Sequence, residues 1–249
     1  MANQRLSRKI LNICIVCIII IAIIFIAMML ILNYDVKGET NMPFQISKIY
    51  IVSTVDGQDV ESDEYKWNIN VTQNNDIYLY VEKNKEYSKQ ETISSIKLDN
   101  FNIKQKPTIG ELQIYKPTVS DTSIFQNIDE NIAKEIIFKG TKSSDTRNLE
   151  ISNQGGPVAF RCANNNIGNF SSNDDEEINF NQLLKKLNIS EENLTGVVSF
   201  NMTLTLDSGK SFKAENIELK IPNSNIVEEG RVGIEYTDLQ NIIFKRIEN

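Results

Sequence analysis

Tyrosine and asparagine side chains alternate with apolar residues between positions 67 and 81. Tyr78 and Tyr80 fall on the polar side of one segment, and Asn68 and Asn70 fall on the polar side of the segment before it. Aromatic rings can stack on sugar rings, and amides can bond to sugar hydroxyl groups. The pattern therefore predicts a carbohydrate-binding surface. The alternative is that a second layer of structure covers these side chains, which would make them packing residues.

The densest group of oxygen-bearing side chains lies at residues 173–177. Asn173, Asp174, Asp175 and Glu177 offer the carboxylate and amide oxygens that Ca²⁺ prefers. Their spacing differs from that of an EF-hand loop, which needs acids at alternate positions and a central glycine. The two interpretations are a calcium site and a solvated acidic loop, and no other cofactor is expected.

Histidine is absent from the whole chain. This absence excludes Ser/His/Asp and Cys/His nucleophile systems and removes the commonest zinc ligand. Carboxylates alone hydrolyse glycosidic bonds in many enzymes, but no spacing here marks such a pair. We therefore expect a protein without enzymatic activity, with a carboxylate-dependent glycan hydrolase as the alternative.

An apolar run over residues 10–32 is interrupted only by Asn12. Its length suits a single-pass transmembrane helix, because a membrane core of about 30 Å needs roughly 20 apolar residues. Arg5, Arg8 and Lys9 precede the run, which predicts a signal-anchor with a cytoplasmic N-terminus, residues 1–9, and an extracellular bulk. Cleavage as a signal peptide near Asn33 is the alternative.

The chain beyond this run is acidic. Three of the 26 Lys and Arg residues precede it, so residues 34–249 carry 23 basic against 33 acidic residues, a net charge of −10. Nucleic-acid binding needs clustered basic residues and is therefore not expected. The predicted partners are the membrane through residues 10–32 and an envelope protein or glycan.

Cys162 is the single cysteine outside the apolar run, so residues 34–249 have no intramolecular disulfide. It shares a strand face with Val158 and Phe160, which predicts a buried thiol. A secreted domain without disulfides depends on its hydrophobic core, which favours a Gram-positive bacterial cell surface.

Most of the chain beyond the linker at 33–42 alternates with the period of a β-strand. The first strand is expected over 44–55, ended by the Asp-Gly pair at 56–57. Strands over 67–71 and 77–81 are expected to form a hairpin around the polar turn 73–76, with Trp67 in the core beside Ile69 and Val71. A second hairpin joins 198–206 to 212–221.

Two interruptions of the alternation predict β-bulges. The apolar phase slips by one residue near Asn100 and again at residues 215–216. Apolar residues at Phe180, Leu183, Leu184 and Leu187 have helical spacing. A second helix is expected over 129–138.

These patterns predict a mainly β fold, an antiparallel β-sandwich of Ig-like or jelly-roll type over residues 43–249, following the transmembrane helix. Two tandem units, about 43–118 and 133–249, are an alternative. The expected function is that of a membrane-anchored, extracytoplasmic binding or scaffolding protein, with a carbohydrate-binding module as the nearest alternative. A scaffolding role would predict an exposed apolar patch or an unpaired strand edge.

Overall fold

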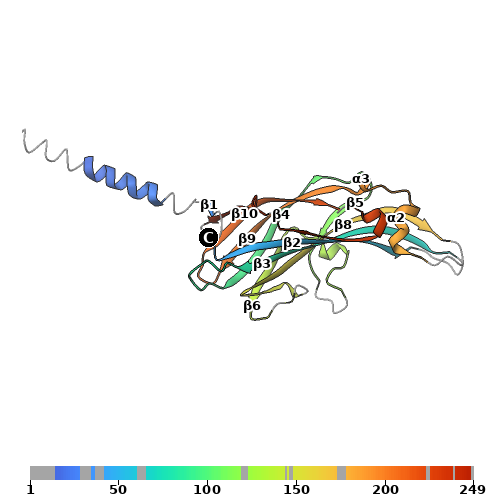
Figure 1. Cartoon of the computed structure of the whole chain (residues 1–249), viewed down its shortest axis with the longest axis horizontal. Coiled ribbons are helices and arrows are strands. Elements are labelled where there is room, and N and C mark those ends of the chain that lie inside the picture. Colours follow the sequence, from blue (N-terminus) through green and yellow to red (C-terminus); the bar gives the residue numbers. More distant parts are fainter. Residues whose placement is uncertain are drawn as a thin grey trace, which may run out of the picture.

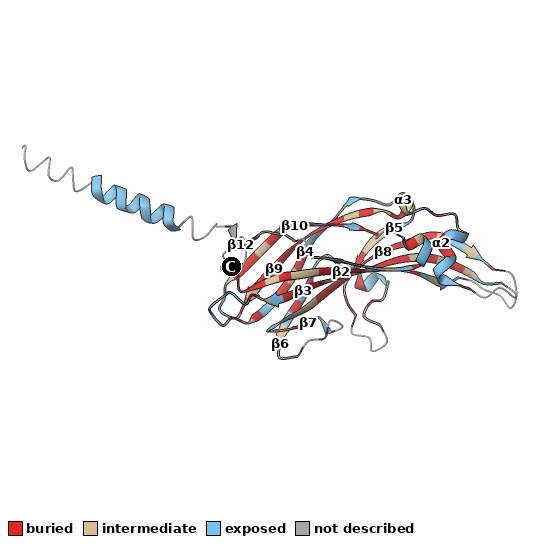
Figure 2. Cartoon of the chain, viewed as in Figure 1, coloured by how far each residue is buried: buried red, intermediate tan, exposed pale blue. Residues whose placement is uncertain are grey.

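The computed structural model describes residues 15–28, 35–36, 42–60, 66–118, 123–143, 145, 148–172, 178–222, 225–237 and 239–247. Residues 15–28 form an α-helix with exposed side chains (Figure 2). No helix built from the described residues combines the length and the apolar character needed to cross a membrane. The apolar run 10–32 extends beyond residues 15–28 at both ends.

The remaining described residues form a mainly β fold of two sheets (Figure 1). One sheet has five strands, all antiparallel, including three long ones that give it its length. Their order across the sheet is β11 (Arg231–Tyr236), β2 (Phe44–Asp59), β3 (Asn68–Lys83), β8 (Gly155–Ser171) and β5 (Glu111–Tyr115).

The other sheet has seven strands. It is antiparallel except where β6 and β7 run parallel. Their order is β1 (Asp35–Val36), β12 (Phe244–Ile247), β10 (Ser211–Ile221), β9 (Gly196–Leu206), β4 (Ile93–Gln105), β6 (Ile136–Thr141) and β7 (Glu150–Ser152).

The two sheets share one hydrophobic core, as expected for a β-sandwich. Phe160 from the five-stranded sheet meets Phe101 and Phe200 from the seven-stranded sheet, with ring centroids 5.3 and 5.1 Å away. Cys162 is buried there, as predicted, and burial raises the pKa of its thiol. Strands from 43–118 pair with strands from 133–249 in both sheets, so the two ranges share their sheets. The finer Ig-like or jelly-roll assignment stays a prediction.

Both predicted bulges are confirmed. Asn100 and Asn216 have φ values of 52° and 54°, in the left-handed region that asparagine tolerates better than most residues. The register shifts between Asp99 and Asn102 in β4 and between Ala214 and Ile217 in β10. Each extra residue restores the apolar phase, which keeps the later half of the strand facing the core.

A second hydrophobic cluster lies beyond the sandwich, between the five-stranded sheet and three short helices. These helices are α2 (Leu183–Lys186), which directly follows η3 (Phe180–Gln182), α3 (Glu191–Leu194) and α4 (Ile226–Glu229). Leu183 and Leu184 are fully buried against Val71 of β3. The predicted helical spacing from Phe180 to Leu187 is therefore present as two short turns rather than one helix.

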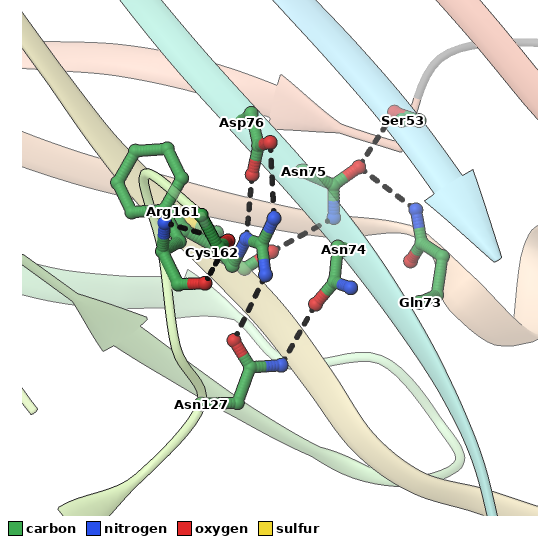
Figure 3. Close-up of polar contacts among 10 residues, drawn as sticks. Ser53, Gln73, Asn74, Asn75, Asp76, Asn127, Arg161 and Cys162 are labelled. Carbon is green, nitrogen blue, oxygen red and sulfur yellow. Dashed lines mark hydrogen bonds and ion pairs between the residues drawn. The ribbon is translucent and has the colours of Figure 1, made fainter. Parts of the chain in front are cut away.

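The predicted hairpin around residues 73–76 is wrong, because these residues lie in the middle of the continuous strand β3. Gln73 and Asn75 face inward between the two hydrophobic clusters and are fully buried. Asn75 Oδ1 accepts from Ser53 Oγ at 2.6 Å and from Gln73 Nε2 at 2.8 Å, and Asn75 Nδ2 donates to the Cys162 carbonyl at 3.1 Å (Figure 3). Partners on β2 and β8 thus form the hydrogen bonds of buried polar side chains in a segment whose sequence resembles a turn.

Three other local expectations are also wrong. Residues 56–57 continue β2, because this strand pairs with β3 as far as Asp59. The helix expected over 129–138 is replaced by η1 (Asp129–Asn131) and the start of β6. Trp67 is exposed, at 49% of its surface, because β3 begins only after it, at Asn68.

Candidate ligand-binding groove

A polar groove lies on the outer face of the five-stranded sheet, the face turned away from the hydrophobic core. Its volume is about 570 Å³. The strands contribute its floor and the segment 125–129 contributes one side. The lining residues are Asp56, Gly57, Gln58, Asn70, Thr72, Glu111, Gln113, Tyr115, Phe125, Gln126, Asn127, Asp129, Arg161, Asn165 and Asn166.

The strand register explains how distant residues meet in this groove. Asp56 of β2 lies opposite Thr72 of β3, and Glu111 of β5 lies opposite Asn165 of β8. Because side chains alternate between the two faces of a sheet, polar residues at alternate positions of adjacent strands form one continuous surface.

Arg161 fastens the segment 125–129 to the sheet. Its Nε and Nη2 atoms donate to the two carboxylate oxygens of Asp76, at 2.6 and 3.0 Å, and its Nη1 donates to Asn127 Oδ1 at 3.2 Å (Figure 3). Asn127 Nδ2 in turn donates to Asn74 Oδ1 at 2.8 Å. The guanidinium also lies 5.0 Å from the centre of the buried Phe125 ring. Arg161 therefore positions this side of the groove, and its charge is already paired with Asp76.

Gln113, Tyr115 and Asn165 form a preorganised polar wall. Gln113 Oε1 accepts from the Tyr115 hydroxyl at 2.5 Å and from Asn165 Nδ2 at 3.0 Å. Asn165 Nδ2 also donates to the Tyr115 oxygen at 2.9 Å. Tyr115 is only 2% exposed, and burial raises the pKa of its hydroxyl above the usual value. A locked arrangement of this kind lowers the conformational entropy that a ligand must overcome on binding.

The groove has a negative electrostatic character. Its lining includes three carboxylates, from Asp56, Glu111 and Asp129, and one guanidinium, from Arg161. Asp76 neutralises that guanidinium through a bidentate ion pair. The arrangement therefore suits a neutral or cationic polar ligand and disfavours an anionic one.

The four predicted carbohydrate-binding residues share one face of β3 but do not gather at one place. Asn70 lines the groove, and its Nδ2 donates to Asn166 Oδ1 at 2.5 Å. Asn68 lies just beyond it and accepts from Ser171 Oγ at 2.7 Å. Tyr78 lies roughly 26 Å from Asn70, because a strand rises about 3.3 Å per residue.

Tyr78 and Tyr80 belong instead to the other half of the outer face. Tyr78 lies opposite Tyr50 of β2 and Ala159 of β8, and burial together with the nearby Asp76 carboxylate raises its pKa to about 12. The Tyr80 ring lies 4.9 Å from Lys48 Nζ, which forms an ion pair with Glu235. These tyrosines are partly covered, and they do not line the groove.

The predicted calcium ligands Asn173, Asp174, Asp175 and Glu177 lie outside the described residues. Among the residues that the structure describes, no group of three or more acidic, cysteine or histidine side chains is arranged to hold a metal ion.

Sequence reasoning missed the Gln113–Tyr115–Asn165 wall, although a signal for part of it was present. Gln113 and Tyr115 alternate with Leu112 and Ile114, which is the pattern of a strand with one polar face. Nothing local connects that strand with Asn165 or with the segment 125–129, because their proximity depends on the order of the strands. No family model, curated protein or solved structure matches the chain.

Proposed function

We propose that this protein is a membrane-anchored binding protein of the cell envelope whose polar groove recognises a carbohydrate. The observation that carries the proposal is the Gln113–Tyr115–Asn165 wall, which presents locked amide and hydroxyl groups inside a groove of about 570 Å³. Carbohydrate sites use such fixed polar groups to select the orientation of hydroxyl groups. The negative lining favours neutral or amine-bearing sugars over sulfated or phosphorylated ones.

The membrane part of the proposal is supported by the apolar run 10–32 and its basic flank. The chain would cross the membrane once, with residues 1–9 inside the cell and the sandwich outside. Protease added to intact cells should digest the C-terminal part and leave a short membrane-protected fragment. Resistance of the sandwich in intact cells, with digestion after lysis, would contradict this orientation.

A glycan array tests the binding activity with the full-length chain in lipid nanodiscs. We expect binding to a restricted set of neutral or amine-bearing glycans and a loss of about tenfold in affinity for Gln113→Ala, since one lost hydrogen bond to a ligand costs roughly 1 kcal/mol or more. Gln154→Ala is the matched control, because Gln154 is an exposed turn residue far from the groove lining. Equal binding by both variants, or no binding by the wild type, would contradict the proposal.

A second candidate function, glycan hydrolysis, is favoured by the carboxylates of Asp56, Glu111 and Asp129 in the same groove. Retaining and inverting glycosidases both act through a pair of carboxyl groups. Release of reducing ends from a bound glycan, abolished by Asp56→Asn or Glu111→Gln, would favour hydrolysis. Binding without turnover would favour the non-enzymatic function.

A further inference from the structure

Strand β10 has different neighbours along its two halves. β9 lies beside both halves, whereas β12 pairs only with Ser211–Ala214. Within the described residues, no strand pairs with Ile217–Ile221 on the side away from β9. We call Ile217–Ile221 the open edge of β10. Such an edge presents backbone donors and acceptors to any further strand.

The hairpin between β9 and β10 indicates which backbone groups point outward. The N–H of Leu206 donates to the carbonyl of Lys210 at 2.9 Å. Bonded and non-bonded positions alternate along an antiparallel pair, and the observed register then places Leu219 at a position bonded to β9. The N–H and C=O groups of its neighbours, Glu218 and Lys220, therefore point away from β9.

A groove of about 400 Å³ follows this edge. Its floor is largely apolar and comes from β2, from the end of β11 and from the connection between β11 and β12. The lining residues are Ile49, Glu215, Asn216, Ile217, Glu218, Leu219, Lys220, Tyr236, Leu239, Asn241 and Ile242. An incoming strand would thus find both unpaired backbone groups and apolar surface to cover, the two requirements of strand addition.

We infer that the open edge of β10 pairs with the same edge of a second copy of this chain. An antiparallel pair centred on Leu219 places Glu218 opposite Lys220 of the second copy, and the two-fold axis repeats this pair. Opposite charges at facing positions stabilise an antiparallel pair, and like charges destabilise it. A centre on Glu218 or on Lys220 would instead bring like charges together.

The same centre also aligns the backbone. Glu218 and Lys220 carry the outward-pointing N–H and C=O groups, so their facing positions are those at which an antiparallel pair exchanges hydrogen bonds. The inward side chains Ile217, Leu219 and Ile221 are at most 7% exposed and already belong to the hydrophobic core. Pairing would therefore join the two seven-stranded sheets into one sheet. A single register satisfies both charge and backbone, which is why a second copy is the occupant we assign.

Charge-exchange variants of the full-length chain in detergent test this dimer by sedimentation equilibrium. We expect a reversible dimer for the wild type and an increase of about tenfold or more in the dimer dissociation constant for Glu218→Lys or Lys220→Glu, because each change creates two like-charge pairs. The double variant Glu218→Lys, Lys220→Glu should restore the wild-type constant. Thermal unfolding should match the wild type in all three, since both side chains are exposed.

Lys104→Ala is the matched control. Lys104 lies 3.7 Å from Glu218 within one chain, so this variant removes the intramolecular ion pair without changing the edge. A Cys14→Ser, Cys17→Ser background permits a second readout, because Cys162 is fully buried. In that background, a mixture of Glu218→Cys and Lys220→Cys chains should form an interchain disulfide that neither variant forms alone.

Four results would overturn the inference. The wild type could remain monomeric at every concentration. Binding of an extended peptide at this edge in its place would also overturn the inference, because the occupant would then be a different one. The dimer could form but respond to neither charge reversal, which would place its interface elsewhere, for example in the N-terminal apolar run. The charge reversals could weaken the dimer without recovery in the double variant.

Discussion

Asn164 and Asn165 are neighbours on β8, yet they belong to two different polar regions on opposite faces of the five-stranded sheet. Asn164 points inward, is fully buried, and lies opposite Gln73 in the layer between the two hydrophobic clusters. Asn165 points outward into the groove and joins Gln113 and Tyr115. Asparagine is therefore buried on the inner face, at Asn164, and accessible to a ligand on the outer face, at Asn165. Residue type and spacing therefore do not distinguish a structural amide from a ligand-facing one, whereas the packing of the sheet does.

The largest expected effect concerns the centre of the inner layer. Asn75→Ala should lower the free energy of unfolding by about 3 kcal/mol, because it leaves the buried Ser53 hydroxyl and Cys162 carbonyl without their partner. Urea denaturation of the full-length chain measures this loss. A loss as small as that of a partly exposed control, Asn153→Ala, would mean that the inner layer does not stabilise the fold.

The next effect concerns the outer face, where Arg161 supports both the fold and one side of the groove. Arg161→Ala should cost about 2 kcal/mol of stability, since it leaves the partly buried Asp76 carboxylate without its bidentate partner. It should also weaken ligand binding, because Asn127 and Phe125 lose their attachment to the sheet. A double-mutant cycle with Asp76→Asn checks whether the two side chains are coupled. Additive effects would contradict the role given to this ion pair.

A smaller effect on stability is expected for two glutamines, Gln73 on the inner face and Gln113 on the outer face, which should differ in their effect on ligand binding. Gln73 Oε1 is buried and accepts no hydrogen bond from the described residues, so Gln73→Leu should change the free energy of unfolding by less than about 1 kcal/mol. Gln113→Leu should leave stability similarly unchanged, since Gln113 lines the groove, but it removes the polar wall and should weaken glycan binding about tenfold or more, as expected for Gln113→Ala. Denaturation and binding measured on both variants distinguish the faces. Loss of binding by Gln73→Leu at unchanged stability would contradict the separation.

The smallest effect is confined to alkaline pH. The pKa of Tyr78 is raised to about 12, first by burial, whereas an unfolded tyrosine has a pKa of 10.0. The unfolded state therefore loses its proton first, and this contribution to stability is complete below pH 10.0 and declines as the pH rises to about 12. Tyr78→Phe should reduce the decline, measured as the change in urea midpoint between roughly pH 9 and pH 11. An identical decline in the variant would exclude this linkage.

Features that depend on neighbouring positions could be predicted from the sequence. The alternation over 198–221 located β9 and β10, and the phase slips at Asn100 and Asn216 located both bulges, because a bulge leaves a one-residue mark in a strand pattern. The turn predicted at residues 73–76 is wrong because the conformation of these residues depends on distant partners. Their side chains resemble a turn, and only partners on β2 and β8 make them strand residues.

The candidate site was less predictable than the strands. The strand face of Asn70 predicts a ligand-facing position, and Asn70 does line the groove. Tyr78 and Tyr80 would lie close to Asn70 only in a hairpin, and β3 is a continuous strand instead. The Gln113–Tyr115–Asn165 wall needs β5 beside β8, and that order is set by the packing of the whole sandwich. Sequence alternation identifies the polar face of a strand but not the strand that will lie next to it.

The length of β2 has a mechanical consequence. This strand begins at Phe44, close to the proposed tether, and reaches the groove at Asp56 and Gln58, held to β3 by 15 registered residue pairs. A pull between the proposed membrane anchor and a bound carbohydrate would load these pairs in shear, so that many hydrogen bonds bear the force together instead of opening one after another. A protein with the proposed function would thus gain resistance to forced unfolding from this arrangement, with no disulfide in residues 34–249 to reinforce it.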